Sequence, residues 1–486
     1  MDEAAPAADG AGRGEPTAAV QRVYGDFGLA AMPAASANSA VAAERLSRHA
    51  ASLKGQRASP SWATRFWRGR VRAPGELSAV AVLLQVFIPF ALGHYLSWLL
   101  RTVNAMLAPQ MLQAVQLTPA QLGTLTSTYF LAFAFAQLPV GLALDRHGPR
   151  RVQAVMLLIA AAGTYAFAQS QSFTQMAIAR GIMGLGLAAC FMAAMKAIST
   201  WISPQKAPSV QGYLIAAGGL GAATATLPVR LALHYTDWRG ILTALAICCA
   251  ALAAAIMLIA PTEPPAAPKP LSRRALKEIF THKAFRDTAA LVLIPHTVYF
   301  GIQGLWISRW LADTAYLDQQ AIAWLLYLGM AGVIFGAIAV GMLTEWAARH
   351  GRQPIDLAAL GIAAFVIIQC AMIVGARPAM PMVAVAFMLV GTITGIEYTI
   401  VAQSVPPALM GRTSTCLNLL IFTGAFAVQA GFGAIVACWS AGPAGRAPAQ
   451  AYQCAFAVLV LLQLPGLLHY LRTRYRAHRE ASRSIR

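Results

Sequence analysis

Apolar residues occur along the chain in long runs, separated by short polar segments, from Leu77 to residue 471. An α-helix rises 1.5 Å per residue, so about 20 apolar residues cross the roughly 30 Å of hydrocarbon in a bilayer. Helices are expected because lipid leaves open strand edges without hydrogen-bond partners. The pattern predicts twelve membrane-spanning helices, near 77–100, 119–142, 151–169, 173–200, 209–234, 240–260, 287–310, 320–345, 354–375, 379–403, 414–438 and 451–471.

The composition also indicates a membrane protein. Of the 486 residues, 58% are hydrophobic and only 11% are charged, whereas soluble domains contain about 25% charged residues. The formal net charge of +19 raises the alternative of a nucleic-acid partner. The basic residues, however, fall in alternate connecting segments, a pattern that orients membrane helices. No nucleic-acid partner is therefore expected.

The positions of these basic residues predict the topology. Arginine and lysine gather before the first span, after the second, sixth, eighth and tenth spans, and after the last. By contrast, 169–175 contains neither, and 311–319 carries only Asp313 and Asp318 as charged residues. By the positive-inside rule both termini are expected in the cytoplasm, with the protein spanning an inner (plasma) membrane of the bacterial type.

Polar segments divide the chain. Residues 1–75 are rich in Ala, Gly, Pro and Ser and contain no signal-peptide apolar core, so a disordered cytoplasmic tail is expected; a start codon placed too far upstream fits equally well. The segment 261–286, Pro-rich and then basic, is expected to be a cytoplasmic loop between two six-helix halves, 76–260 and 287–471. Residues 472–486 form a basic tail, predicted to be cytoplasmic.

A sequence repeat relates the two halves. The repeated positions are Gly141, Asp145, Arg146, Gly148, Arg150 and Arg151 after the second span, and Gly341, Glu345, Arg349, Gly351 and Arg352 after the eighth. Such duplication is typical of transporters that bind a solute near the bilayer midplane between two bundles. Charge-assisted bonds around Asp145, echoed at Glu345, would hold one access state closed. The alternative is a solvated basic loop that only sets topology.

The first copy of the repeat resembles the loop signature of the major facilitator superfamily, a Gly, three residues, Asp-Arg, then Gly and a basic pair. Three other segments are similar to that superfamily: Arg180 with Gly184 and Gly186, Trp238-Arg239, and Gly411-Arg412. The resemblance covers roughly 77–471. It implies a transporter, not an enzyme, with two six-helix bundles related by pseudo-twofold symmetry that rock around a central cavity.

Polar residues in the first span are candidates for solute binding. His94, Ser97, Arg101 and Asn104 are three or four residues apart and therefore share one helix face. A guanidinium binds carboxylate or phosphate in a planar fork, so Arg101 is the predicted anion anchor. The stretch resembles the first helix of organophosphate/phosphate antiporters and related anion carriers, where an Arg between a Tyr and a Pro anchors the anion. The alternative is that Arg101, late in the span, reaches the outer headgroups.

The seventh span gives weaker candidates. His296 and Gln303 are seven residues apart, hence on one face, and are minor candidates for solute contact. Phe300 stands where the resemblance would place the antiporters' second anion-binding arginine, which argues against a phosphate-ester substrate. Arg309 is expected at the outer interface, in an aromatic belt with Trp306 and Trp310.

Glu397, in the tenth span, is the predicted proton-coupling residue. An acid at that depth is costly and is therefore a functional candidate, able to load and release a proton during transport. The alternative is a permanent pair with a buried arginine. Arg180, in the fourth span, is the candidate partner or part of a relay; otherwise it tethers neighbouring helices.

No cofactor or metal is expected, because the seven cysteines lack metal-ligand spacing. Cys438 and Cys454 flank one outward loop and are able to pair in principle, but free thiols are the preferred interpretation. The chain is expected to be monomeric, with membrane lipid, a small solute and protons as its partners.

The sequence thus predicts a secondary active, proton-coupled transporter of a small organic anion that works by alternating access. One alternative is a drug/proton efflux antiporter, which an acid in the first, fourth or fifth span would favour; those spans contain none. Another is a transport-inactive membrane sensor that uses the N-terminal tail to bind a partner.

Overall fold

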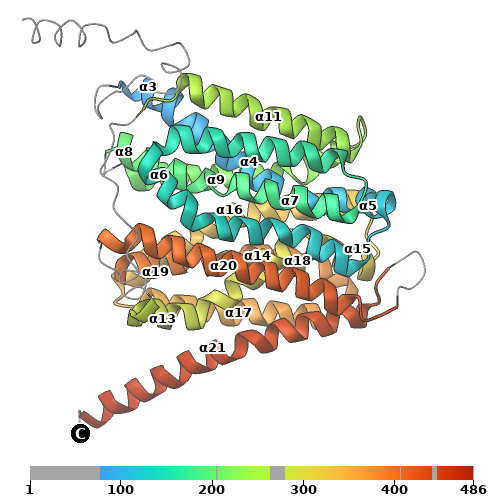
Figure 1. The fold of residues 1–486 in the computed structure, drawn as a ribbon. Helices are drawn as coiled ribbons and strands as arrows, with labels where there is room; N and C mark the ends of the chain where they lie inside the picture. Colours follow the sequence, from blue (N-terminus) through green and yellow to red (C-terminus); the bar gives the residue numbers. More distant parts are fainter. Residues whose placement is uncertain (1–76, 204–205, 263–279, 405–406, 441–445, 485–486) are drawn as a thin grey trace, which may run out of the picture. The chain divides into compact units, whose positions relative to one another are not determined.

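The computed structural model describes residues 77–484, except 204–205, 263–279, 405–406 and 441–445. The predicted tail 1–75 and most of the 261–286 segment lie outside the described residues. The described part is helical and contains no β-strand, and all its helices belong to one compact unit, Thr64–Arg486. The long helices run roughly along one direction (Figure 1).

Helices in the first half of the sequence are α3 (Ala79–Val82), the π-helical η1 (Leu83–Phe87), α4 (Ile88–Thr102), α5 (Asn104–Val115), α6 (Pro119–Gln169), α7 (Phe173–Leu187), α8 (Cys190–Trp201), α9 (Ala207–Thr224), α10 (Leu227–Ala232) and α11 (Trp238–Ile259). Those in the second half are α13 (Lys283–Thr288), η2 (Ala289–Leu293), α14 (Ile294–Gln303), α15 (Trp306–Thr314), α16 (Gln319–Arg349), α17 (Pro354–Val374), η3 (Arg377–Ala379), α18 (Met380–Gly391), η4 (Thr392–Gly395), α19 (Ile396–Ser404), α20 (Pro407–Val436) and α21 (Ala449–Ser484).

Ten of the described helices are long and apolar enough to cross a membrane. Phe285–Gln303 and Trp306–Thr314, bent by 60°, would together make an eleventh. The 51 residues of α6 form two helices joined at a kink. Its backbone leaves helical geometry at Gly148 (φ 75°), which glycine tolerates without a Cβ clash. The all-helical, multi-pass membrane fold is confirmed, whereas the predicted number of twelve spans stays a prediction.

The helical path that contains the first span is longer than its apolar run. Helix continues from Ala79 to Val115 with one break, at Val103 between α4 and α5. The part that qualifies as a membrane span, Ala79–Thr102, ends close to the predicted end near residue 100. The polar residues Arg101 and Asn104 interrupt the apolar run but not the helical path, because both are buried against other helices.

Helices α6 and α20 join the two halves of the sequence. A Cβ on Gly123 of α6 would lie 2.9 Å from the carbonyl oxygen of Gln429 in α20, so only glycine permits this approach. Farther along the same contact, the rings of Phe133 and Phe422 lie 4.4 Å apart between centroids. This packing fixes the aromatic surroundings of Arg101.

Candidate functional site

Arg101, at the end of α4, lies inside a cage of aromatic rings. Its guanidinium carbon lies 4.4 to 6.0 Å from five ring centroids, those of Trp98, Tyr129, Phe133, Phe300 and Phe422. Tyr129 and Phe133 lie roughly 15 to 21 Å along α6 from its first residue. The guanidinium thus lies about halfway along the part of α6 that precedes the kink at Gly148.

The charge of Arg101 has no counter-charge in the described part of the chain. The residue is 8% exposed, its Nε is buried without a hydrogen-bond partner, and no described carboxylate forms an ion pair with it. Cation–π contacts stabilise a guanidinium by roughly 0.5 to 2 kcal/mol each without using its N–H donors. The ring cage therefore holds the cation while leaving those donors available to an anion.

The other polar residues of the predicted face are also buried. His94 accepts a hydrogen bond from the indole N–H of Trp98 at Nε2 (3.1 Å), while its Nδ1 is buried and unpartnered. Neither polar atom of the Asn104 side chain has a partner, although the residue is 1% exposed. Ser97 is buried on the same helix. Buried polar atoms are normally hydrogen-bonded, so these unpaired groups near Arg101 mark a place for a polar ligand.

Arg180 supports the backbone that carries Arg101. Its Nη1 donates to the carbonyl of Leu100 (2.9 Å) and its Nη2 to that of Arg101 (3.1 Å). These carbonyls lie in the last turn of α4, where helical partners are lost. No described contact joins Arg180 to Glu397, so the Arg180–Glu397 pair considered from the sequence is absent, and Arg180 tethers α7 to α4.

Glu397 is paired with His296 instead. Its Oε1 lies 2.7 Å from Nδ1 of His296, both side chains are buried, and its Oε2 has no partner. The imidazole stacks on Phe300, with centroids 4.9 Å apart and planes at 15°. The guanidinium of Arg101 lies 5.4 Å from the centroid of the same ring. Phe300 thus separates the predicted anion anchor from the predicted proton site.

Two amides connect Tyr398, the residue after Glu397, to α6. The hydroxyl of Tyr398 donates to Asn418 Oδ1, and Asn418 Nδ2 donates to Gln137 Oε1 (3.3 Å). The sequence interpretation missed Gln137 and Asn418, although amides inside apolar spans are themselves a signal. Gln303 lies apart from these groups and donates to the sulfur of Met330 (3.6 Å).

At the loop motif, Asp145 pairs with a lysine that the sequence interpretation missed. Lys196, on α8, donates to Asp145 Oδ1 and to the carbonyl of Leu144, each at 2.8 Å. Arg150 instead binds the carbonyl of Met257 and the hydroxyl of Thr262 (3.3 Å), near the end of α11. The structure therefore connects this motif to two other helices of the first half.

The other residues of the loop motif and of its repeat differ in their exposure and contacts. Arg146 is exposed and Arg151 half-buried, Gly141 lies within α6, and Gly148 is at its kink. Glu345 and Arg349 form an exposed pair one turn apart (3.5 Å). Such pairs contribute about 0.3 to 0.5 kcal/mol. The echo of the motif in the second half is thus a weak local contact.

One prediction about the seventh span is wrong. Trp306 and Trp310 are each 1% exposed, so they do not form a lipid-facing belt. Trp306 donates to the carbonyl of Gln429 (3.1 Å), and Arg309 pairs with Asp313 (3.1 Å). The 60° bend before Trp306 turns these side chains inward, which a straight-helix interpretation does not anticipate.

The cysteines and metal-ligand residue types form no site in the described part. Cys438 and Cys454 are exposed and both free, so they do not form a disulfide. No group of three His, Cys, Asp or Glu among the described residues is arranged to hold a metal ion.

Segments of the chain are similar to known transporters. A 107-residue segment is 31% identical to the nitrate/nitrite transporter NrtP of Picosynechococcus sp., covering 22% of this chain and 20% of that protein. A 124-residue segment is 29% identical to a probable L-galactonate transporter of Escherichia coli K12, covering 26% and 27%. The chain thus matches about a fifth to a quarter of the length of these relatives.

The fold and the family profile extend much further. A bacterial homologue of the human lysosomal transporter Spinster, solved in an inward-facing and unoccupied conformation, matches with a TM-score of 0.65 at 17% identity, over 81% of this chain and 97% of that one. The profile of the Major Facilitator Superfamily matches residues 90–430, from the first predicted span into the eleventh. On this match the chain belongs to the Major Facilitator Superfamily.

Proposed function

We propose that this protein is a secondary active transporter of a small organic anion. The observation that carries the proposal is the buried guanidinium of Arg101, which has no ion-pair partner among the described residues and lies about halfway along the part of α6 that precedes its kink. The named relatives support it, since nitrate, nitrite and L-galactonate are all anions. Members of this family are transporters, not enzymes, and move solutes by alternating access.

The anion would bind in a defined way. A carboxylate accepts two parallel N–H bonds from a guanidinium, so Arg101 would hold it bidentately. The buried, unpartnered atoms of Asn104 and the Nδ1 of His94 would meet polar groups on the rest of the solute. The rings of Trp98 and Phe300 would pack against its carbon skeleton, as aromatic faces pack against apolar surfaces.

Protons would enter through the His296–Glu397 pair. Both groups exchange protons, and they lie 2.7 Å apart in a buried site beyond the ring of Phe300. Moving one elementary charge across the membrane costs about 2.3 kcal/mol per 100 mV. A proton that accompanies a monovalent anion cancels this cost, so symport fits a cation site and a proton site placed side by side.

The topology and gate complete the proposal. From the distribution of basic residues we expect both termini, and the end of the second span that carries Asp145, to face the cytoplasm of a cell with a bacterial-type inner membrane. The Asp145–Lys196 ion pair would hold that end of α6 and α8 together in one access state. The six-plus-six division at 261–286 and the pseudo-twofold rocking of two bundles belong to the same proposal.

Uptake of radiolabelled L-galactonate and of nitrate into proteoliposomes, with and without an imposed inward proton gradient, tests the function. Arg101→Gln should lower kcat/KM by at least about a hundredfold, because charge-assisted hydrogen bonds to the anion are lost. Arg377→Gln, which removes an exposed arginine at the start of η3, is the matched control and should stay within about twofold. Undiminished uptake of both anions by Arg101→Gln would sink the proposal.

A further inference from the structure

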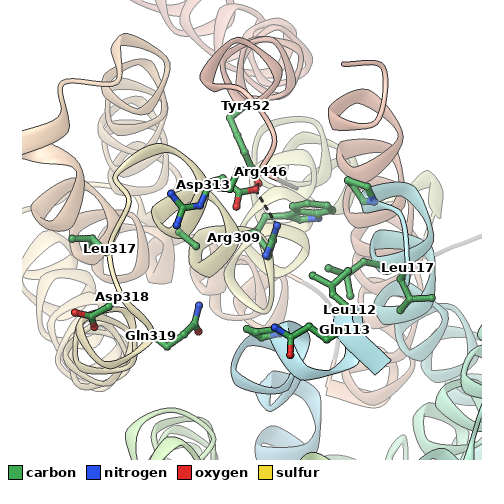
Figure 2. A pocket seen from close by; sticks show the side chains of 15 residues that line it. Leu112, Gln113, Leu117, Arg309, Asp313, Leu317, Asp318, Gln319, Arg446 and Tyr452 are labelled. Carbon is green, nitrogen blue, oxygen red and sulfur yellow. Dashed lines mark hydrogen bonds and ion pairs between the residues drawn. The ribbon is translucent and has the colours of Figure 1, made fainter. Parts of the chain in front are cut away.

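A cavity separate from the Arg101 cage lies at the start of α6, far from the Asp145–Lys196 pair. Its volume is about 620 Å³, within the roughly 300 to 1,000 Å³ typical of ligand pockets. Pro119, the first residue of α6, lines it, and Asp145 lies about 39 Å farther along that helix. We call it the Arg446 cavity, after the arginine that lines it (Figure 2).

Segments from both halves of the sequence form the walls. Gln113 and Pro119 come from the first half, and Arg309, Gln319 and Arg446 from the second. Gln113 lies on α5, which continues the helical path that carries Arg101, roughly 18 Å away along the axis. The cavity therefore lies on the same helical path as the Arg101 cage, at the end that the basic-residue pattern predicts to face outside.

Both carboxylates in the cavity wall accept hydrogen bonds from protein groups. Asp313 Oδ2 accepts hydrogen bonds from Arg309 (3.1 Å), from the hydroxyl of Tyr452 (2.7 Å) and from the backbone N–H of Ala447 (3.4 Å). Asp318 Oδ1 accepts from the backbone N–H of Ala321 (2.7 Å), near the start of α16. The charge of Asp313 is thus offset by Arg309, whereas the exposed Asp318 has no ion-pair partner among the described residues.

The donors in the wall are not committed in this way. Arg446 lies over the ring of Tyr316, 5.0 Å from its centroid. Within the described residues it forms no hydrogen bond or ion pair, and the side chains of Gln113 and Gln319 form none either. Figure 2 shows Arg309, Arg446, Gln113 and Gln319 around the same space. The groups left over are therefore a guanidinium and two amides, which suit a small carboxylate that also bears hydroxyls.

We propose that the Arg446 cavity is a second anion site, which takes up the substrate anion before it reaches Arg101. The inference rests on the proposed transport function and adds to it a site of capture. Because the cavity is open to water, its charge is screened by salt and its affinity is lower than that of the buried site. Arg446 is the residue that first binds the incoming anion.

A matched pair of variants isolates Arg446. Arg377 and Arg446 both lie over Tyr316, at 4.8 and 5.0 Å from its centroid, but Arg377 does not line the cavity. Arg446→Gln should raise the KM for L-galactonate uptake by about threefold to tenfold with kcat within about twofold, since capture and not translocation is affected. Its KM should also depend less on salt. Arg446→Lys should recover part of the loss, and Arg377→Gln should leave KM unchanged.

A binding measurement separates the cavity from the central site. In detergent-purified Arg101→Gln protein, millimolar L-galactonate should still raise Tm, because a ligand that binds the folded state stabilises it. Adding Arg446→Gln should remove this residual shift, and adding Arg377→Gln should not.

The outcomes divide cleanly between the two proposals. Equal KM changes in Arg446→Gln and Arg377→Gln, or no change in either, would overturn the capture site while leaving transport through Arg101 standing. Full uptake by Arg101→Gln would overturn the central anchor, and the KM of Arg446→Gln would still decide the cavity. If neither L-galactonate nor nitrate binds or enters with any variant, both proposals fail.

Discussion

Two buried arginines lie side by side in this protein and are held in opposite ways. Arg180 donates hydrogen bonds from both Nη atoms to backbone carbonyls, whereas Arg101 is surrounded by rings and donates none to a described group. The Nε of each is buried without a partner. Both guanidinium carbons lie over Tyr129, at 5.0 and 6.0 Å from its centroid. Burial alone therefore does not identify a binding residue; what distinguishes the two is whether the protein has already used the hydrogen-bond donors.

Arg180→Met should show the largest change in stability. It leaves the carbonyls of Leu100 and Arg101 buried without their donors, so the free energy of unfolding should fall by about 2 to 4 kcal/mol. Thermal melting of the purified protein in detergent measures this. The comparison breaks down if Arg180→Met melts at the wild-type temperature while its L-galactonate uptake is lost.

Arg101→Met should change stability in the other direction. Replacing an unpaired buried charge with an apolar side chain of similar length removes a desolvation penalty, so stability should rise by about 1 to 3 kcal/mol. The same melting experiment measures it, with uptake recorded in parallel to show that transport is lost. A clear drop in Tm for Arg101→Met would mean that the cation–π contacts make this arginine structural, like Arg180.

Glu397→Gln tests whether the His296–Glu397 pair, on one side of Phe300, carries the proton while Arg101, on the other side, binds the anion. Glutamine keeps the shape and a hydrogen bond to His296 but exchanges no proton. Accumulation of L-galactonate driven by a pH gradient should fall by about tenfold, while exchange of internal for external L-galactonate persists. Retained gradient-driven accumulation would assign the proton elsewhere, and loss of exchange as well would indicate a packing defect.

Lys196→Met should have the smallest effect. The Lys196–Asp145 pair is partly exposed, with side chains 26% and 54% accessible, and exposed pairs contribute about 0 to 1 kcal/mol. Stability should therefore change by less than about 1 kcal/mol, whereas cysteine labelling from the two sides of the membrane should show a shifted balance of access states. Unchanged labelling would reduce the motif to a topology signal.

The sequence predicted the helices better than it predicted which side chains contact one another. The apolar runs predicted where the long helices lie, and helical spacing placed His94 and Arg101 on one helix, whereas Asn104 begins α5 beyond the break at Val103. The depth of Arg101 in the first span was harder to predict, because Arg101 itself ends the apolar run from which depth is judged. The sequence did not predict the ring cage around Arg101. Its members Tyr129, Phe133, Phe300 and Phe422 resemble ordinary apolar residues in their own spans.

Pairing across the fold was harder still. Glu397 meets His296, which is 101 residues away, and Asp145 meets Lys196, which is 51 residues away. Nothing in the local pattern of either residue specifies its partner. The sequence did identify Glu397 and Asp145 as charges that need one, and it named Arg180 as a possible tether.

The bend between α14 and α15 divides the seventh span into a longer and a shorter arm. Its longer arm carries His296, while the shorter arm is fastened elsewhere, through Trp306 to the carbonyl of Gln429 and through Ser308 to that of Ala105 (3.5 Å). Net hydrogen-bond contributions are about 1 kcal/mol each. The short arm also buries Trp306 and Trp310, so these hydrogen bonds are a small part of what holds it. The bend thus divides the seventh span into an arm that carries His296 of the proton pair and a packed arm that bears Arg309 in the wall of the Arg446 cavity.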